Sequence, residues 1–340
     1  MTAPFWVWAL TIVGLGVLMV IDFYAHVRKP HEPSFRESAL FSGIFVALAI
    51  AFGIGLTLVW GTRHGAEFFA GYVTEWSLSV DNLFIFLIIM TKFAVPRIYQ
   101  QKVLMVGIVI ALLFRGAFIL AGAAAISRFS WVFYLFGAFL VGTAIVLARE
   151  DHDSEIEFHE NRFLRIVRRV IPSTTTYHGD RLTTRDGGRR LMTPMLVVMI
   201  AIGSTDLLFA LDSIPAIFGL TKEPYIVFTA NAFALLGLRQ LYFLLGGLLA
   251  RLEYLKYGIA FILFFIGVKL VLHALHTNEV PFINGGAGFG WAPEIDTWTS
   301  LGVIVVSMAV ATIASLVKAR ADARRRGHTL AEELPQFADE

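Results

Sequence analysis

Cysteine is absent from the chain, which excludes disulfide bonds, thiolate metal ligands and thiol redox chemistry by the chain itself. Charge is also scarce, because 16% of the 340 residues are charged and 57% are hydrophobic, with a mean hydropathy of +0.70. A soluble domain has about 25% charged residues. The formal net charge of +2 gives no indication of nucleic-acid binding. A metal held in the protein core would need oxygen or imidazole ligands.

Long apolar runs are abundant instead. Runs of about 20 mostly apolar residues, enough to cross roughly 30 Å of hydrocarbon, recur from end to end. The sequence therefore predicts an all-α polytopic membrane protein, whose first span lacks the preceding Lys or Arg of a signal peptide and should remain as a helix. The nine predicted spans are Phe5–His26, Leu40–Trp60, Phe68–Met90, Val103–Ala125, Trp131–Ala148, Pro194–Gly219, Tyr225–Leu249, Leu255–His276 and Trp298–Val317.

Basic residues in the loops predict the orientation. Outside the spans, every Lys and Arg except Arg63, Arg128 and Lys222 lies on one side of the membrane in this arrangement. Loops rich in Lys and Arg remain in the cytoplasm and contact anionic lipid. We therefore expect an inner (plasma) membrane protein with the N-terminus outside and the C-terminus in the cytoplasm.

Several ionisable residues lie inside the spans, although each costs about 2.5 to 3.5 kcal/mol at the bilayer centre on insertion scales. Ion pairs between helices could neutralise three of the acids, because three bases are present. Even with Asp22 assigned to the membrane interface, the four other acids outnumber the three bases. The acids are Asp22, Glu75, Asp81, Asp206 and Asp212, and the bases are Arg115, Arg239 and Lys269.

The third and sixth spans repeat one pattern, and a buried Arg follows one span later in "LLFRGAFI" and in "LGLRQLYF". Spans three to five and six to eight are therefore predicted to be two copies of a three-helix unit, in opposite orientations because the number of helices is odd. Many secondary transporters bind substrate where such inverted units meet. The repeated pattern is Glu75, Asp81 and Asn82 in the third span, and Asp206, Asp212 and Ser213 in the sixth.

This organisation divides the chain into six parts. They are two N-terminal spans (1–60), the first unit (61–148), a cytoplasmic loop (149–193), the second unit (194–276), an external loop (277–297), and a final span with a basic tail (298–340). The cytoplasmic loop contains "FLRIVRRVIP", which favours an amphipathic helix on the inner leaflet. It also contains "EDHDSEIEFHE", a solvated segment or a metal-collecting one. His273 and His276, one turn apart, are a candidate metal site at the outer exit.

The six residues of the repeated pattern are the predicted metal ligands. Carboxylates, an amide and hydroxyls without thiolate suit divalent ions such as Mn²⁺, Mg²⁺ or Ca²⁺. Ser79 lies on the same helical face as Glu75, and Pro215 frees the backbone carbonyl of Leu211. Buried carboxylates also bind protons, so exchange of a metal for protons is chemically reasonable. The cation is expected as a transported ligand, with no cofactor permanently bound.

Five segments together resemble the TerC/Alx family, which is grouped with the LysE transporter superfamily: "EWSLSVDNLFIF", "STDLLFALDSIPAIF", "IVFTANAFALLGLRQLYFLL", "FIGVKL" and "YHGDR". The resemblance implies a role in metal-ion homeostasis, manganese export in particular, with the six residues above as ion-binding positions. It implies supporting roles for Arg115, Asn231, Arg239 and Lys269. The chain departs from the pattern at Gly203, where the family often has Glu. Tellurium is taken as a family name, because thiols that reduce tellurite are absent.

Three function classes remain open. A metal exporter requires Asp81 and Asp212 for transport. An intramembrane aspartyl hydrolase would use the same two residues as an acid/base pair, but the chain lacks the GxGD pattern of such proteases. A non-transporting partner that assists metallation or assembly of other proteins would tolerate conservative changes at these acids. We expect the exporter rather than an enzyme; the pattern makes no prediction of oligomeric state.

Overall fold

The computed structural model describes residues 3–24, 31–129, 131–149, 174, 177, 179–186, 189–245, 254–280 and 283–325, without the side chains at positions 81, 84, 185, 186, 189, 190, 245 and 322–325. Within these residues, nine helices are long and apolar enough to cross a membrane, as the sequence predicts. They are α1 (Phe5–Asp22), α2 (Phe35–Trp60), α3 (Thr62–Lys92), α4 (Arg97–Arg128), α5 (Val132–Arg149), α7 (Pro194–Phe218), α8 (Pro224–Leu245), α9 (Leu255–His276) and α10 (Thr297–Arg325).

Local signals set several helix ends. The Ser34 hydroxyl accepts a hydrogen bond from the backbone N–H of Glu37 at 3.2 Å, so α2 begins before the predicted span start at Leu40. Pro194 occupies the first position of α7, where its missing N–H has no helical partner to lose. Helices α3, α4 and α10 also extend beyond the predicted spans, because their polar end turns remain helical outside the apolar run.

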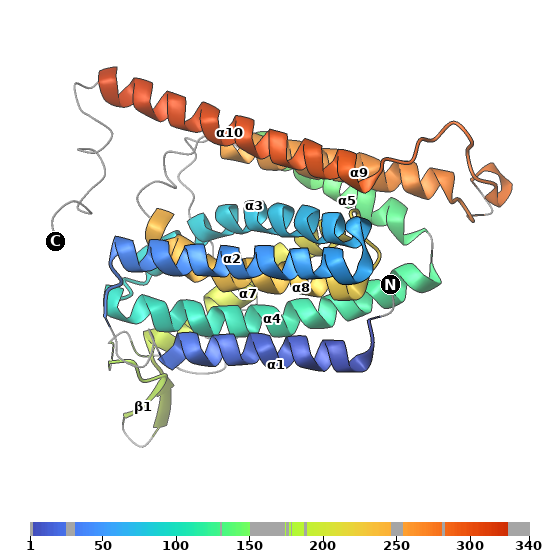
Figure 1. Cartoon of the computed structure of the whole chain (residues 1–340). Helices are drawn as coiled ribbons and strands as arrows, with labels where there is room; N and C mark the ends of the chain where they lie inside the picture. The colour runs from blue at the N-terminus through green and yellow to red at the C-terminus, as the bar shows by residue number, and fades with distance from the viewer. Residues whose placement is uncertain are drawn as a thin grey trace.

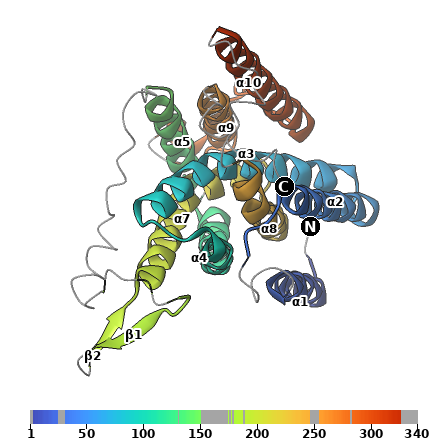
Figure 2. The same cartoon turned by 90° about the vertical axis from the view of Figure 1, so that its left-hand side faces the viewer.

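The inner helices are α3, α7 and α8, and the outer ones include α1, α2 and α10 (Figures 1 and 2). Within the most apolar stretch of each helix, 89% of residues are buried in α8, 69% in α3 and 67% in α7, against 17% in α1 and 22% in both α2 and α10. The outer helices therefore present apolar side chains to lipid, whereas the inner helices can carry polar groups away from it.

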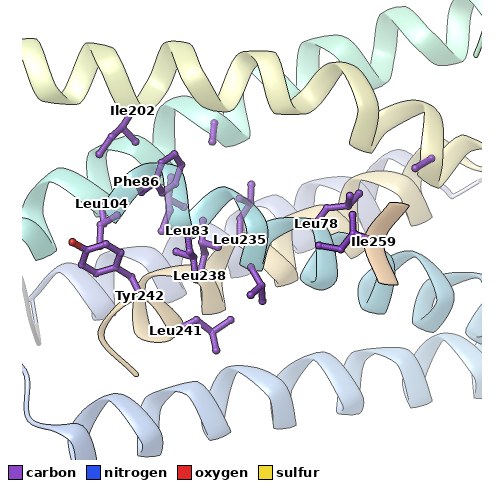
Figure 3. Packing of buried hydrophobic residues seen from close by; sticks show 14 of the residues in the cluster. Leu78, Leu83, Phe86, Leu104, Ile202, Leu235, Leu238, Leu241, Tyr242 and Ile259 are labelled. Atoms are coloured by element: carbon purple, nitrogen blue, oxygen red, sulfur yellow. The ribbon is translucent and has the colours of Figure 1, made fainter. Parts of the chain in front are cut away.

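Apolar side chains from α3, α4, α7, α8 and α9 form the main core cluster (Figure 3). Association of helices within a membrane depends on close van der Waals packing, because lipid tails are as apolar as the side chains. This packing fixes the positions of the helices that carry the candidate ligands. The labelled members in Figure 3 are Leu78, Leu83, Phe86, Leu104, Ile202, Leu235, Leu238, Leu241, Tyr242 and Ile259.

A β-hairpin stands immediately before α7 and projects from one end of the helices (Figure 1). Strands β1 (Thr183–Asp186) and β2 (Arg189–Met192) pair antiparallel, with Thr183 opposite Met192. This hairpin is absent from the sequence-based prediction of a loop. The Asp-Gly-Gly-Arg sequence at 186–189 is a hairpin signal that could have revealed it.

The "YHGDR" segment ties this hairpin region to the turn between α3 and α4. The hydroxyl of Tyr177 donates a 2.7 Å hydrogen bond to the backbone oxygen of Phe93. Lys102 Nζ donates to Asp180 Oδ2 at 2.6 Å, and this bond and charge hold the pKa of Asp180 below its usual value. The start of α7 is therefore linked to the junction of α3 and α4.

Three sequence-based predictions lie outside the described residues. They are the amphipathic helix in 163–172, the His- and acid-rich segment 150–160, and the basic tail beyond residue 325. The predicted external loop between α9 and α10 contains one turn of 3₁₀ helix, η3 (Asn284–Gly286), in which Gly285 adopts a φ of +64° that favours glycine.

Candidate functional site

A buried guanidinium joins three helices near the middle of the molecule. Arg115 of α4 donates from Nε and Nη2 to the two carboxylate oxygens of Asp206 on α7, at 3.0 Å each. Its Nη1 donates to Oε1 of Glu75 on α3 and lies 3.4 Å from Oγ of Ser213 on α7. One basic side chain therefore holds the first acid of both repeated patterns, and we call these four residues the Arg115 cluster.

Charge within the Arg115 cluster is unequal. The exposed fractions are 1% for Arg115, 0% for Glu75 and 2% for Asp206, so none of these groups reaches solvent. One guanidinium faces two carboxylates, which leaves one negative charge in excess when both acids are ionised. The second carboxylate oxygen of Glu75, Oε2, is buried and has no hydrogen-bond partner among the described residues. The cluster therefore has more carboxylates than bases and one unused carboxylate oxygen.

Small residues allow α4 and α7 to approach each other at this level. A Cβ added to Gly107 would lie 2.7 Å from Cγ2 of Ile202, and one added to Gly203 would lie 2.9 Å from Cγ2 of Ile110. This close approach brings Arg115 within reach of the α7 carboxylate. At Gly203, where the resembled family often has Glu, the Ile110 side chain occupies the space that a side chain would need.

Other polar residues in the middle of α3 are also buried. The exposed fractions of Ser77 and Ser79 are 1% and that of Asn82 is 6%. The Ser77 hydroxyl donates to the backbone oxygen of Val73 at 2.6 Å, whereas Oγ of Ser79 has no hydrogen-bond partner among the described residues. Because α3 is packed on several sides, these three residues lie inside the protein although they face different directions.

The structure describes the side chain of only one of the two second acids, Asp212. Asp81 belongs to α3, but its side chain lies outside the described residues. Asp212 of α7 is half-buried, and its neighbour Ser213 faces the Arg115 guanidinium. The hydroxyl of Thr205 donates to the backbone oxygen of Ala201 one turn earlier in α7, at 2.8 Å. Glu75, Asp206 and Ser213 are therefore the predicted ligands that the structure brings together.

Arg239 forms a separate buried ion pair. Its Nη2 donates to Oδ1 of Asp22 at the end of α1, and its Nη1 has no hydrogen-bond partner among the described residues. Asp22, which the sequence assigns to the membrane interface, is 7% exposed and is therefore covered by protein. The pair joins α1 to α8.

Lys269 and Asn231, the other predicted supporting residues, lie in different surroundings. Lys269 of α9 donates from Nζ to Oγ of Ser300 on α10 at 2.8 Å. Asn231 of α8 is 1% exposed, and no described residue forms a hydrogen bond with its amide nitrogen or amide oxygen. Lys269 therefore connects two helices, while Asn231 retains unused donors and an acceptor in the core.

A cavity of about 820 Å³ lies at the end where α3 begins and α7 ends. Glu67 on its wall is buried and accepts hydrogen bonds from Nε of Arg63 at 3.0 Å and from the Thr221 hydroxyl at 2.8 Å. Burial lowers the pKa of Lys222, against an opposing effect from Glu294. Glu67 is missing from the sequence-based site, although its spacing from Arg63, four residues earlier on one helix, was a usable signal.

The candidate exit histidines line or adjoin this cavity. Nδ1 of His273 lies 3.6 Å and Nε2 of His276 lies 4.0 Å from the same Glu294 oxygen, Oε1. Among the His, Asp and Glu side chains that the structure describes, no three are arranged to hold a metal ion.

Apolar side chains occupy α7 between the cavity and the Arg115 cluster. Ile214, Ile217 and Phe218 belong to one buried cluster with Val227 of α8, and Phe218 also lines the cavity. Ser213, which contacts Arg115, immediately precedes this apolar segment. The cavity therefore ends at a hydrophobic layer on the path toward the buried acids.

Comparison with known proteins agrees with the membrane architecture. An uncharacterized membrane protein of Mycobacterium tuberculosis is 51% identical over 322 residues, which cover 94% of this chain and 81% of the relative. The thylakoid membrane protein TERC of Arabidopsis thaliana is 40% identical over 87% of this chain and 71% of its own length. Alx of Photorhabdus laumondii, provisionally named a membrane-bound redox modulator, is 38% identical over 78% of this chain and 85% of its own length.

No solved structure matches the chain. The family described as integral membrane protein TerC matches residues 60–323, from the end of α2 into α10, and includes every residue of the Arg115 cluster. The chain belongs to the TerC family of integral membrane proteins.

Proposed function

We propose that this protein exports a divalent metal cation, manganese in the first place, in exchange for protons. The observation that carries the proposal is that two buried carboxyl groups face one guanidinium in the Arg115 cluster, so one negative charge is in excess when both are ionised. An uncompensated charge inside a protein costs several kcal/mol. A bound cation or proton would offset this cost, and the two could therefore replace each other at the site.

The second acids would complete the ligand set. Asp81 and Asp212 follow Glu75 and Asp206 by six residues on the same helices, and Asn82 adds an amide oxygen. Such oxygen ligands without thiolate suit manganese, magnesium or calcium. Manganese is preferred on the resemblance to the family stated above.

Helix packing supports the inverted repeat that the proposal requires. Helix α3 packs on α8 and α4 packs on α7, while α5 packs on α9. A two-fold axis that exchanges α3–α5 with α7–α9 would convert the first contact into the second and leave the third unchanged. In addition, α3 reaches the cavity with its first residues and α7 with its last, so these two helices run in opposite directions.

One residue-level contact follows the same two-fold relation. A Cβ on Gly137 of α5 would meet the backbone oxygen of Gly267 on α9 and the side chain of Val271. A Cβ on Gly267 would meet the backbone oxygen of Gly137 and the side chain of Val141. Each glycine thus faces the other, and a Cβ on each would meet the valine that follows the other glycine by four residues. Transporters of this design bind substrate between their two units.

The proposed location is the plasma membrane, with the cavity on the outer side. Arg63 and Lys222, two of the few basic residues predicted outside, both line the cavity. Lys102 and the hairpin lie on the side predicted to be cytoplasmic. Export would then run from the hairpin side, past the Arg115 cluster, to the cavity.

The name of the Alx relative suggests a second role, in redox balance. The absence of cysteine means that this chain would influence redox state indirectly, for example by changing the metal available to other proteins. A non-transporting metallation partner and an aspartyl hydrolase differ from the exporter in one measurable respect, because neither moves a cation across a sealed membrane.

Reconstitution into proteoliposomes tests the proposal. Fluxes of Mn²⁺, Mg²⁺, Ca²⁺ and Zn²⁺ are measured under an imposed pH gradient, with proton movement recorded in parallel. We expect Mn²⁺ flux coupled to proton flux, abolished by Asp81→Asn and by Asp212→Asn. Asp180→Asn is the matched control, because Asp180 lies outside the spans and is exposed, and it should transport normally. No flux of any of the four cations through folded protein would refute the exporter.

A further inference from the structure

We propose that Arg115 is a tethered competitor of the transported cation, holding the carboxylates of Glu75 and Asp206 until a divalent ion replaces it on Glu75. This inference rests on the proposed transport function. It assigns the guanidinium a specific part in transport, in addition to its role in helix packing.

The two carboxylates are held unequally. Asp206 receives two parallel hydrogen bonds from Nε and Nη2, both 3.0 Å, which is the strong bidentate geometry of an Arg–carboxylate pair. Glu75 receives a bond to one oxygen only, from Nη1, and its other oxygen has no partner. Glu75 is therefore the carboxylate that Arg115 can release while remaining attached to α7.

The surroundings of Glu75 offer a cation what a guanidinium does not use. Oε2 of Glu75 and Oγ of Ser79, one turn later on the same face of α3, are both buried, and neither has a hydrogen-bond partner in the part of the chain that the structure describes. Both are oxygen atoms, which divalent ions such as Mn²⁺ bind readily. An ion arriving here would find these two oxygens unused, and it would compete with Arg115 only for the other carboxylate oxygen of Glu75, Oε1.

Electrostatics makes the two cations alternatives. A guanidinium cannot lose its proton in a protein, so Arg115 keeps its positive charge throughout. A divalent ion on Glu75 would be repelled by a guanidinium in hydrogen-bonding contact with the same carboxylate, and the repulsion is large because the site is buried. Binding of the ion therefore requires Nη1 to move away, for example toward Ser213, which already lies 3.4 Å from it.

The geometry also predicts a link between binding and helix packing. Arg115 and Glu75 both belong to the first repeated unit, so release of Nη1 from Glu75 loosens the contact between α3 and α4 within that unit. The pair of Arg115 with Asp206 on α7 joins the two units and remains in place. A cation bound at Glu75 would thus free α3 from α4 while the two units stay connected.

Metal binding by the purified full-length protein in lipid nanodiscs tests this inference. Free Mn²⁺ is quantified by its electron paramagnetic resonance signal during titration of wild type, Arg115→Gln and Arg115→Lys. We expect Arg115→Gln to bind Mn²⁺ about tenfold more tightly or better, because the competitor is removed. Arg115→Lys, which keeps the charge but loses the bidentate contact, should give an intermediate affinity. Arg128→Gln, an exposed residue near the end of the same helix, controls for loss of one positive charge.

Added guanidinium ion provides an independent readout. In Arg115→Ala, guanidinium at non-denaturing concentration should fill the vacated space and weaken Mn²⁺ binding competitively. It should not do so in Arg128→Ala. A purely structural arginine would show no competition, because guanidinium and Mn²⁺ would not share ligands.

The outcomes separate the two proposals. Unchanged or weaker Mn²⁺ binding by folded Arg115→Gln, with wild-type binding intact, overturns the competitor role and leaves transport standing. Failure of Glu75→Gln to fold also overturns it, because this change removes the charge only from the contact that is released in each cycle and leaves the pair of Arg115 with Asp206 in place. Absence of Mn²⁺ binding and flux in wild type contradicts the proposed function itself.

Discussion

The contact between Gly137 and Gly267 leaves no room for a methyl group, and Gly137→Ala should destabilise the packing of α5 on α9. A Cβ at position 137 would lie 2.7 Å from Cγ2 of Val271 and 2.8 Å from the backbone oxygen of Gly267. Restoring ordinary contact distances requires a displacement of about 0.6 to 0.7 Å, and part of it must come from the α9 backbone.

The size of the effect follows from a comparison within one helix. Replacing Gly by Ala inside a helix contributes about 0.5 to 1 kcal/mol of stability from backbone entropy. Gly142→Ala should show this gain, because nothing lies within 4 Å of its added Cβ. At Gly137 the same gain is opposed by overpacking, typically 1 to 3 kcal/mol. The two variants should therefore differ by about 1 to 3 kcal/mol, since the entropy term is common to both.

Thermal unfolding of purified protein in detergent, followed by helical circular dichroism, measures this difference. Gly267→Ala should resemble Gly137→Ala, because its Cβ meets the Gly137 oxygen at 2.9 Å. Equal unfolding temperatures for Gly137→Ala and Gly142→Ala would refute the assigned contact between α5 and α9.

Two further predictions concern the ion pairs. Asp22→Ala should destabilise the protein by about 3 to 5 kcal/mol, because it leaves buried Arg239 without its carboxylate. Replacing both residues by Leu should recover most of this loss. Thermal unfolding measures both variants, and a wild-type unfolding temperature for Asp22→Ala would contradict the pairing. The Lys102–Asp180 contact should weaken in acid, since a carboxyl with a lowered pKa stabilises above its unfolded pKa and this contribution disappears as pH falls through the folded value, below about pH 4. The protection of β1 and β2 amides relative to their intrinsic exchange rates should then fall at low pH in wild type but not in Asp180→Asn, and equal responses would count against the Lys102–Asp180 contact.

Most of the fold could be predicted from hydropathy and charge. The nine spans follow from apolar run length alone, because the bilayer requires about 20 such residues. The β-hairpin escaped prediction because its Asp-Gly-Gly-Arg turn lies within a charged loop without strong alternation of apolar residues. Composition could identify membrane helices but not a short hairpin held by tertiary contacts such as Tyr177 to Phe93.

The candidate site was predictable in its members and not in its pairing. The sequence contains Glu75, Asp206 and Arg115 at recognisable positions, but three bases and five acids allow many combinations. Only the close approach of α4 to α7 assigns Arg115 to both carboxylates. Asp22 illustrates the same limit, because its position at the end of a span does not reveal that a helix far along the chain covers it.

The pairing of Asp22 with Arg239 has a consequence for biosynthesis. The two residues are 217 positions apart. At a synthesis rate of about 5 to 20 residues per second, the carboxylate of Asp22 exists for roughly 10 to 40 s before its partner has been made. During that interval the guanidinium of Arg239 is not yet available to Asp22, so we expect Asp22 to remain at the hydrated membrane surface. The final depth of the first helix is then set late, when α8 enters the bilayer.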